Sequence, residues 1–401
     1  MNNGALMLFR VAVFAAFAST CASFAPCHRV YPLLQGHHGK LRSALSLSPA
    51  RKKDKKKRSA RNKDKKNKKG KNRRAARPSL TRNERRLRSR ACDCAGCRAT
   101  GCAVDEAVGD VEVVRSATQF FSSAAIAEHR VGGAEEGFHV VVPTETRGWR
   151  TQAKLAAAPR PGGGDGCAFG LYARGTHEVI EMSACRVHHP AINRAIRALT
   201  EATRRAGTRA GAGGLRYVQL RVERATGTVS LALVWGASEL RHTQPALSRL
   251  TEALSDLAPD LWHGAWCHCN DGAGNNIFSR DADAWHRLSG REFVREPLPA
   301  SAPGSLHFSP LVFRQGNADG FDAIAKAVAR RVPGGSRVCE LYAGVGVLGL
   351  TCLAWRHGPR PDGSLGRTTG GDGGAAPLEW VRCSDENPAN ARCFSETLRS
   401  L

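Results

Sequence analysis

The sequence has no run of about 18 or more apolar residues, the length that a membrane-spanning helix requires. It also lacks the Lys-bearing phosphate loop of NTPases, the Gly-x-Ser-x-Gly turn of α/β hydrolases and the His-Glu-x-x-His helix of zinc proteases. Collagen and coiled-coil periodicities are absent, and so are repeats of about 20–50 residues. With 401 residues, of which 42% are apolar, the chain can nevertheless form about two or three globular domains.

Acidic residues are scarce in the first 90 positions, and this scarcity explains most of the net charge of +25. Residues 1–50 hold 4 basic residues and no acidic one, and residues 51–90 hold 22 Lys and Arg against 3 acidic residues. Residues 91–401 hold 34 basic and 32 acidic residues, so they are nearly neutral. A basic balance is typical of nucleic-acid-binding proteins, but here the charge precedes the part that can fold.

Residues 1–50 are predicted to be a bipartite signal and transit peptide. Arg10 precedes a short apolar run over residues 11–18, small residues follow, and no acid occurs up to residue 50. Residues 21–26 (CASFAP) resemble the Ala-Ser-Ala-Phe-Ala-Pro junction of the plastid presequences of algae with complex plastids. We therefore expect import into a plastid, with the nucleus, the nucleolus or a mitochondrion as alternative destinations. We expect no membrane association of the mature protein.

Residues 51–90 are predicted to be a disordered arm, because their Lys and Arg side chains repel one another and few apolar residues are available for burial. Such an arm can bind phosphates without sequence preference, with an affinity that falls as salt rises. The same composition also suits a solvated spacer or a nuclear address. The sequence leaves these interpretations open.

Four cysteines lie close together in the segment 91–110, namely Cys92, Cys94, Cys97 and Cys102. Thiolates at this spacing can bind one soft metal centre, either zinc or an iron–sulfur cluster. A disulfide framework fits less well, because the other cysteines are scattered through a large chain.

Three later cysteines are expected to be buried. Cys185 alone is typical of a small buried hydrophobic residue. Cys267 and Cys269 lie two positions apart on a predicted strand and therefore share one face of it. A second metal site made by these two thiols and His263 is an alternative to simple burial.

Residues 111–308 are predicted to form an α+β domain that binds RNA. Gly and Pro punctuation, alternating polarity and helical spacing indicate the following elements. Strands are expected over 138–142, 149–158, 168–173, 177–182, 215–223 and 228–235, and the last two are expected to form a hairpin across residues 225–227. Helices are expected over 190–206 and 247–257, and further strands up to residue 308.

Residues 309–401 are predicted to begin a Rossmann-like α/β domain. A helix over 318–332 precedes a buried strand over 338–342, which leads into Gly344-x-Gly346 and another helix. The order acid, aromatic, small residue, Gly-x-Gly resembles motif I of S-adenosylmethionine-dependent methyltransferases. Asp385 ends the next predicted strand, where a carboxylate can accept hydrogen bonds from both ribose hydroxyls of a nucleoside cofactor.

Taken in order, these segments resemble the RNA uridine C5-methyltransferase family, in particular its iron–sulfur branch. Cys94-Ala-Gly-Cys97 resembles Cys-Gly-Gly-Cys, Trp149-Arg-Thr-Gln-Ala-Lys154 resembles aromatic-Arg-x-(Lys/Arg)-Ala, and Gly170-Leu-Tyr172 with Cys185 resembles Gly-Phe-Tyr…Cys. Phe313-Arg-Gln-Gly-Asn317 resembles Phe-x-Gln-x-Asn, and Glu340-Leu-Tyr-Ala-Gly-Val-Gly346 resembles Asp-Leu-Phe/Tyr-Cys-Gly-x-Gly.

The resemblance implies S-adenosylmethionine as cofactor, bound by Gln315, Tyr342, Gly344, Gly346 and Asp385. It also implies a 4Fe-4S cluster held by Cys92, Cys94, Cys97 and Cys185, with Cys102 as an alternative to Cys92 and zinc as an alternative metal. The implied substrate is a uridine of tRNA or rRNA in a monomeric enzyme. In this chemistry a Cys thiolate adds to C6, C5 takes the methyl group, and a base removes the C5 proton before the Cys leaves.

Two departures from the family pattern stand out. The nucleophile motif Ser-Cys-Asn-Pro, the preceding Asp-Pro-Pro-Arg and the following Glu do not occur, so no catalytic residue is assigned. We expect the domain to continue beyond Leu401 and the chain as given to be inactive. The basic arm also stands where many relatives have a TRAM β-barrel. The alternative function is a non-catalytic iron–sulfur protein that binds RNA or assists assembly.

Overall fold

The computed structural model describes residues 111–121, 145–357 and 376–401, except 161, 163, 174–175, 273–275, 280 and 300–303. The leader, the basic arm, the cysteines of segment 91–110 and the strand expected over 138–142 lie outside the described residues. The described residues include α3 (Glu112–Phe121), a helix that the sequence patterns did not predict. No helix of the described ranges is long and apolar enough to cross a membrane.

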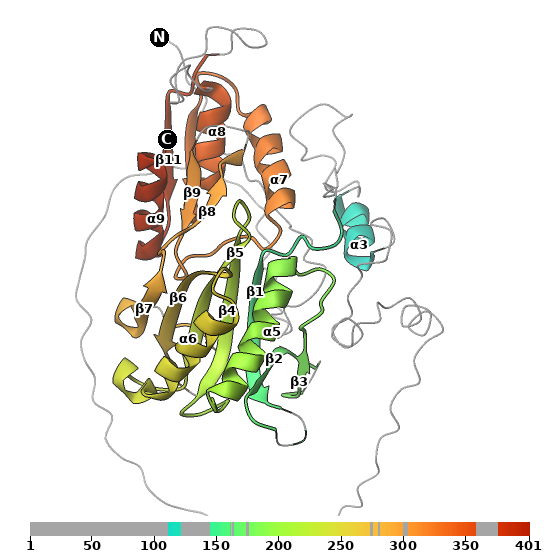
Figure 1. The fold of residues 1–401 in the computed structure, drawn as a ribbon. Coiled ribbons are helices and arrows are strands. Elements are labelled where there is room, and N and C mark those ends of the chain that lie inside the picture. Colours follow the sequence, from blue (N-terminus) through green and yellow to red (C-terminus); the bar gives the residue numbers. More distant parts are fainter. Residues whose placement is uncertain are drawn as a thin grey trace, which may run out of the picture. The chain divides into compact units, whose positions relative to one another are not determined.

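The centre of the fold is a seven-stranded sheet with the strand order β3-β2-β1-β4-β5-β6-β7 (Figure 1). The strands are β1 (Gln152–Pro159), β2 (Cys167–Tyr172), β3 (Val179–Glu181), β4 (Leu215–Glu223), β5 (Thr228–Trp235), β6 (Trp262–Cys269) and β7 (Trp285–Gly290). Neighbouring strands are antiparallel except β5 and β6, which are parallel. The antiparallel pairing of β4 with β5 confirms the predicted hairpin.

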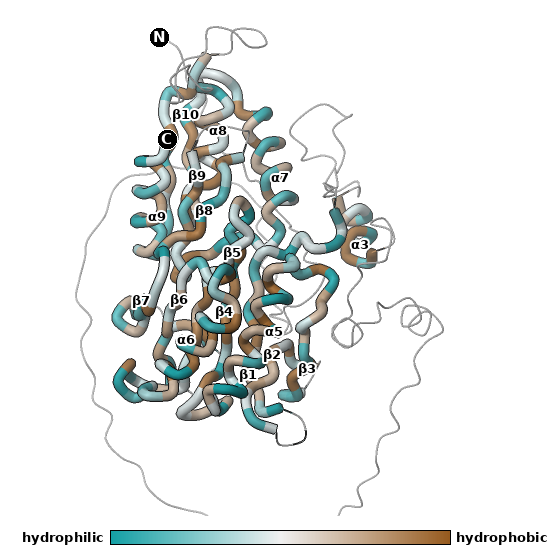
Figure 2. The backbone as a smooth tube through the Cα atoms, viewed as in Figure 1, coloured by the Kyte–Doolittle hydropathy of each residue, from teal (hydrophilic) through white to brown (hydrophobic). Residues whose placement is uncertain are grey.

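Two helices, α5 (Pro190–Arg205) and α6 (Ala246–Leu257), pack on one face of this sheet (Figure 1). Pro190 occupies the start of α5, and the ring Nδ1 of His189 accepts a hydrogen bond from the Ala191 amide. Hydrophobic residues recur every three or four positions along α5 (Figure 2), and the helix face that they form is buried. Both predicted helices are therefore confirmed. Two 3-10 helices, η3 (Leu240–Thr243) and η4 (Ala282–Ala284), lie in connecting loops.

Cys267 and Cys269 pack in the core between the sheet and the helices, as expected from their shared strand face. Burial raises the pKa of both thiols. Within the described part of the chain, no group of three or more His, Cys, Asp or Glu side chains is arranged to hold a metal ion. The expected burial of both thiols is observed, and the ring nitrogens of His263 contact the Thr228 hydroxyl at 3.2 Å and the Phe293 carbonyl at 2.7 Å.

The C-terminal part contains two parallel strands with helices packed on one of their faces. Its elements are β8 (Val294–Pro297), β9 (Ser305–Phe308), α7 (Ala318–Arg331), β10 (Arg337–Leu341), α8 (Val347–His357), β11 (Trp380–Ser384) and α9 (Pro388–Arg399). β8 and β9 form an antiparallel pair, and β10 and β11 form a parallel pair. The order β10-α8-β11-α9 confirms the predicted α/β arrangement of this part.

The strand expected over residues 338–342 is not buried on both faces. Val338 is half-buried and packs toward α7 and α8, while Leu341 on the other face is 63% exposed. The reason is that β10 and β11 carry helices on only one face within the described part of the chain. The prediction of a buried strand was therefore right in position and wrong in burial.

Candidate functional site

The turn between β10 and α8 holds three predicted cofactor-binding residues in left-handed backbone conformations. The φ angles are 55° for Tyr342, 58° for Gly344 and 77° for Gly346. Glycine adopts such angles freely, whereas they cost a residue with a side chain about 1–2 kcal/mol. The Tyr342 side chain is also 84% exposed. A strained, exposed aromatic residue at the carboxyl end of a parallel strand lies where open α/β sheets bind ligands.

Asp385 lies at the carboxyl end of β11 and faces this turn. Its Oδ2 accepts a hydrogen bond from the Gly344 amide at 2.8 Å. Its Oδ1 accepts from the Asn387 amide at 2.9 Å and from the Asn390 side chain at 2.8 Å. Desolvation alone would raise the pKa of Asp385, but these donors outweigh it and hold the pKa below its ordinary value.

The glycines of this region serve two different purposes. A Cβ on Gly346 would lie 2.6 Å from the Phe394 ring, and one on Gly349 would lie 2.8 Å from the Cys383 sulfur. These two glycines therefore allow α8 to pack against α9 and β11. A Cβ on Gly344 would meet no atom within 4 Å, so Gly344 is the position where a ligand can approach the backbone.

Glu340, the acid of the strand motif, turns toward the first turn of α8 instead of the open end of the strand. Its carboxylate accepts hydrogen bonds from the amides of Gly349 at 2.7 Å and Leu348 at 3.4 Å. An anion is favourable at a helix N-terminus because amide N–H groups point toward it. Burial raises the pKa of Glu340 despite these bonds. The acid thus joins β10 to α8.

Gln315, the fifth predicted cofactor residue, lies half-buried on the loop that leads into α7. The Asn387 side chain donates a hydrogen bond to the Leu311 carbonyl of the same loop at 3.3 Å. Because Asn387 is two residues from Asp385, this bond brings the Gln315 loop to the β11–α9 turn. The structure thus joins Tyr342, Gly344, Gly346 and Asp385 directly and Gln315 through its loop.

The loop that carries Gln315 is fixed to the central sheet by a buried arginine, Arg221 of β4. The guanidinium of Arg221 donates to the carbonyl of Ser309 and, at 2.5 Å, to the carbonyl of Val312. Burial and the charge of Arg314 lower the pKa of Arg221 to about 9, so its side chain remains a cation at neutral pH. A loop carbonyl with a charged buried donor is held firmly.

A second buried arginine, Arg314, lies on the loop itself, directly before Gln315, and reaches back to the central sheet. It donates to the Val222 carbonyl at 2.9 Å and to the Thr151 hydroxyl at 3.2 Å, and it pairs with Glu296. Glu296 also accepts from Arg224 at 2.7 Å. The residue next to Gln315 is thereby connected to β4 and β8.

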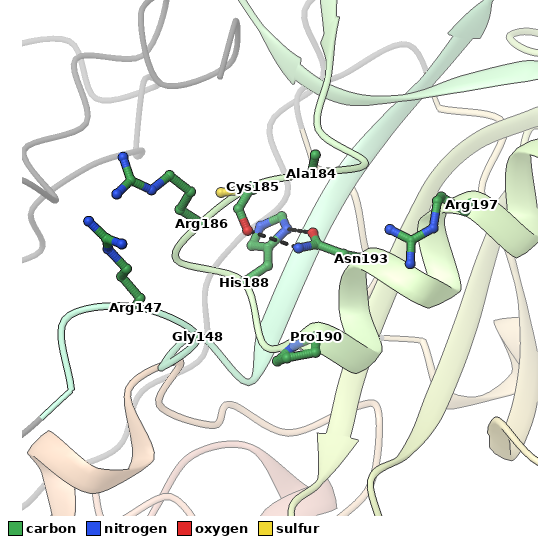
Figure 3. A pocket seen from close by; sticks show the side chains of 9 residues that line it. All are labelled: Arg147, Gly148, Ala184, Cys185, Arg186, His188, Pro190, Asn193 and Arg197. Atoms are coloured by element: carbon green, nitrogen blue, oxygen red, sulfur yellow. Dashed lines mark hydrogen bonds between the residues drawn. The ribbon is translucent and has the colours of Figure 1, made fainter. Parts of the chain in front are cut away.

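Cys185, the predicted fourth ligand of the cluster, is fully buried in the turn between β3 and α5. Its carbonyl accepts a hydrogen bond from the Asn193 side chain at 2.9 Å, and Asn193 Oδ1 lies 3.3 Å from the ring Nδ1 of His188. The residue lines a hollow of about 550 Å³ (Figure 3). The other three predicted ligands, and Cys102, lie outside the described residues.

A backbone ladder connects the Cys185 turn with the Gln315 loop through the segment 148–151. On one side, Gly148 and Arg150 donate to the carbonyls of Arg186 and Val187, at 2.9 and 2.8 Å. On the other side, the Thr151 amide donates to the Gly316 carbonyl at 2.8 Å. This segment is the one whose sequence, Trp149 to Lys154, contributed to the family resemblance.

Sequence reasoning missed Arg221 and Glu296, which hold the loop that carries Gln315. Arg221 stands at an inward position of a predicted strand, and a charged residue there is a usable signal, because buried charges are paired or hydrogen-bonded. Its partners lie about 90 residues away, at Ser309 and Val312. No local pattern identifies them.

Comparison with known proteins places this chain beside RNA methyltransferases. No protein-family model matches it. It is 30% identical over 254 residues to an uncharacterized RNA methyltransferase of Protochlamydia amoebophila, covering 62% of this chain and 58% of that protein. An uncharacterized RNA methyltransferase of Geobacter sulfurreducens is 26% identical over 246 residues, covering 57% and 45%. The chain therefore spans about half the length of the curated relatives it matches.

The crystal structure of the Pyrococcus abyssi tRNA (uracil-54, C5)-methyltransferase in complex with S-adenosyl-L-homocysteine matches with a TM-score of 0.49 and 16% identity. The match covers 77% of this chain and 62% of that one.

Proposed function

We propose that this protein is an RNA methyltransferase that transfers a methyl group from S-adenosylmethionine to C5 of a uridine in tRNA or rRNA. The observation that carries the proposal is the 30% identity over 254 residues to a relative named as an RNA methyltransferase. The contact between Asp385 and the Gly344 amide, at the carboxyl ends of two parallel strands, supports a nucleoside cofactor.

The residues at this turn fit S-adenosylmethionine. Asp385 Oδ2 accepts one hydrogen bond from Gly344, and a carboxylate oxygen has capacity for a second donor, such as a ribose hydroxyl. The space beside Gly344 admits a ligand, and the exposed Tyr342 ring can pack against one. Bound there, the cofactor would supply the electrophilic methyl group. Gln315 would approach it from the loop that Arg221 and Arg314 hold.

No described cysteine is assigned as the nucleophile that C5 methylation requires. Burial and the neighbouring Glu340 carboxylate raise the pKa of Cys383 to about 12, so its thiol stays protonated near neutral pH. Burial also raises the pKa of Cys393. That a nucleophilic Cys and a Glu base follow Leu401 stays a prediction, and sequencing the transcript past that codon tests it.

We further propose a 4Fe-4S cluster, with zinc as the alternative, on Cys185 and the cysteines of segment 91–110. Cys185 fits one position of such a site, because its thiol lies at a hollow and its backbone is fixed by Asn193. Basic side chains at the same hollow would suit the negative charge of a thiolate-bound centre. Plastid import and a monomeric state likewise remain predictions.

The proposed activity is tested by deleting the gene in its source cells and measuring modified nucleosides in their tRNA and rRNA by mass spectrometry. We expect 5-methyluridine at one or more positions to disappear and to return when the gene is restored. Unchanged 5-methyluridine, with a defect only in RNA or ribosome assembly, would instead support the non-catalytic alternative.

A further inference from the structure

Four charged side chains of alternating sign form a continuous network between β8, the hairpin of β4 and β5, and the segment that carries Gln315. Arg314 pairs with Glu296 of β8, and Glu296 accepts a hydrogen bond from Arg224 Nε at 2.7 Å. Arg224 also pairs with Asp319 through its Nη1. Arg224 therefore holds two carboxylates at once, and we call these four residues the Arg224 network.

The two ends of the Arg224 network lie on either side of Gln315. Arg314 directly precedes Gln315, and Asp319 lies in the first turn of α7, four residues after it. Between these ends, the Gly316 carbonyl accepts hydrogen bonds from the Thr151 amide at 2.8 Å and from the Thr151 hydroxyl at 3.2 Å. The backbone on both sides of Gln315 is thus held by fixed contacts, and the network supplies the outer two.

Arg224 itself is carried by a well-fixed part of the fold. It follows the last residue of β4, Glu223, whose fully buried carboxylate accepts hydrogen bonds from the Arg295 amide at 2.9 Å and from Arg295 Nη2 at 3.1 Å. Two neighbouring residues of the hairpin, an acid and a base, thereby pair with two neighbouring residues of β8, a base and an acid. This crossed pairing fixes β8 against the hairpin and gives the Arg224 guanidinium a defined place.

The buried members of the network should contribute most to its effect. The side chains of Arg314 and Glu296 are 2% and 6% exposed, whereas that of Asp319 is 62% exposed. Exposed ion pairs contribute little, but a buried carboxylate that loses a donor is costly. Without Arg224, the Oε2 oxygen of Glu296 would lose its donor, and the side chain would move to satisfy it. Because Glu296 also holds Arg314, that movement would displace the neighbour of Gln315.

From these contacts we propose that Arg224 is a positioning residue for the methyl-donor site. It acts on the affinity for S-adenosylmethionine through Glu296 and Arg314, which set the place of Gln315. Its effect is on binding geometry and not on a step of methyl transfer. The inference rests on the proposed function in one respect, namely that Gln315 contacts the cofactor.

The test is a double-mutant cycle in the full 401-residue chain, with affinity for S-adenosylhomocysteine measured by isothermal titration. Four proteins are compared, namely the wild type, Arg224→Met, Gln315→Ala and the double variant. We expect Arg224→Met to weaken binding about threefold or more in the wild-type background and less than about twofold in the Gln315→Ala background, because residues of one network are not additive. An Arg224 that acted independently of Gln315 would give the same ratio in both backgrounds.

Arg194→Met is the matched control. Arg194 of α5 also makes an ion pair, with both carboxylate oxygens of Asp260 at 2.7 and 3.0 Å, and this pair joins α5 to the residue pair that follows α6 and Ala258. Both partners are exposed, so the control should bind within about twofold of the wild type. If circular dichroism shows that Arg224→Met does not fold, the cycle is run with Arg224→Lys, which keeps a cation and loses the planar fork that contacts two carboxylates.

Four results would overturn the proposal. They are wild-type affinity of the Arg224 variant, wild-type affinity of Gln315→Ala, the same loss in both Gln315 backgrounds, and an equal loss in Arg194→Met. Folded wild-type protein that does not bind S-adenosylhomocysteine would count against the proposed cofactor site, and the role of Arg224 would fall with it. A wild type that binds, with a cycle that shows no coupling, would remove the role of Arg224 alone and leave the proposed function standing.

Discussion

The carboxylate of Asp385 and the backbone amide of Gly344 lie 2.8 Å apart and join the ends of two neighbouring parallel strands. One acidic side chain thereby fixes the glycine turn and keeps hydrogen-bonding capacity for a ligand. The same carboxylate accepts from Asn387 and Asn390, so its position is determined by three donors. The proposed cofactor site depends on this relationship.

Replacing this carboxylate, Asp385→Asn, keeps the shape of the side chain and removes its charge. We expect the affinity for S-adenosylhomocysteine to fall about tenfold or more, because charge-assisted hydrogen bonds to hydroxyls are lost. Isothermal titration of both proteins measures the change. The exposed Asp256→Asn on α6 is the control and should bind like the wild type; an Asp385→Asn variant that also does so would remove Asp385 from the site.

The contribution of Asp385 to stability should decrease in acid. The folded-state pKa of Asp385 lies below its ordinary value of 3.8, so its stabilising contribution is complete above that value. The contribution is lost as pH falls through the folded-state pKa. The difference in unfolding free energy between wild type and Asp385→Asn should therefore be constant near neutral pH and shrink only in strong acid, as urea titrations can show.

Arg221 should affect cofactor binding from a distance. In Arg221→Met, the carbonyls of Ser309 and Val312 lose a buried donor, which we expect to cost about 2–4 kcal/mol of unfolding free energy. The loosened loop should also weaken binding of S-adenosylhomocysteine at temperatures where the variant is still folded. Circular dichroism and isothermal titration together separate the two effects. Stability loss with unchanged affinity would limit Arg221 to a structural role.

The contribution of Glu340 to the unfolding free energy should depend on pH in the opposite direction from that of Asp385, because burial raises the pKa of Glu340 above the ordinary 4.5. As pH falls from neutral toward 4.5, the folded state takes up this proton before the unfolded state does, so the wild type gains stability relative to Glu340→Gln. The measurement is the difference in unfolding free energy between the two proteins at several pH values. A difference that stays flat, or that moves the other way, contradicts the assignment.

The metal prediction rests on Cys185 and has an internal control. Anaerobically purified wild-type protein should contain iron and absorb at about 400 nm, and Cys185→Ser should lose much of both. Cys167→Ser changes another fully buried cysteine, one that packs in the core of the central sheet, and should keep its iron. Zinc without colour in the wild type would select the alternative metal, and metal retained by Cys185→Ser would exclude this ligand.

Local patterns were sufficient for the elements that depend on neighbouring residues. Pro190 and the apolar spacing after it predicted α5, and the turn before Thr228 predicted the β4–β5 hairpin. The parallel pairing of β5 with β6 was not predictable in this way, because it depends on how α6 returns the chain. Strand pairing over such distances is decided by packing of the whole sheet.

In the candidate site too, local patterns predict some features, while others depend on the whole fold. The positions of Asp385 and of the glycines at the ends of two strands were predictable from the local strand and turn pattern. The role of Glu340 was not, because its carboxylate could point either toward a ligand or toward α8, and only the fold decides. The exposure of the Leu341 side chain likewise depends on which elements cover β10.

The most direct test of the account is a titration of the 401-residue chain with S-adenosylhomocysteine, followed by calorimetry. If Tyr342, Gly344, Gly346, Asp385 and Gln315 form the cofactor site, the folded protein will bind one molecule per chain in a saturable manner. Binding of none by protein that circular dichroism shows to be folded would contradict the assignment of this turn as the methyl-donor site.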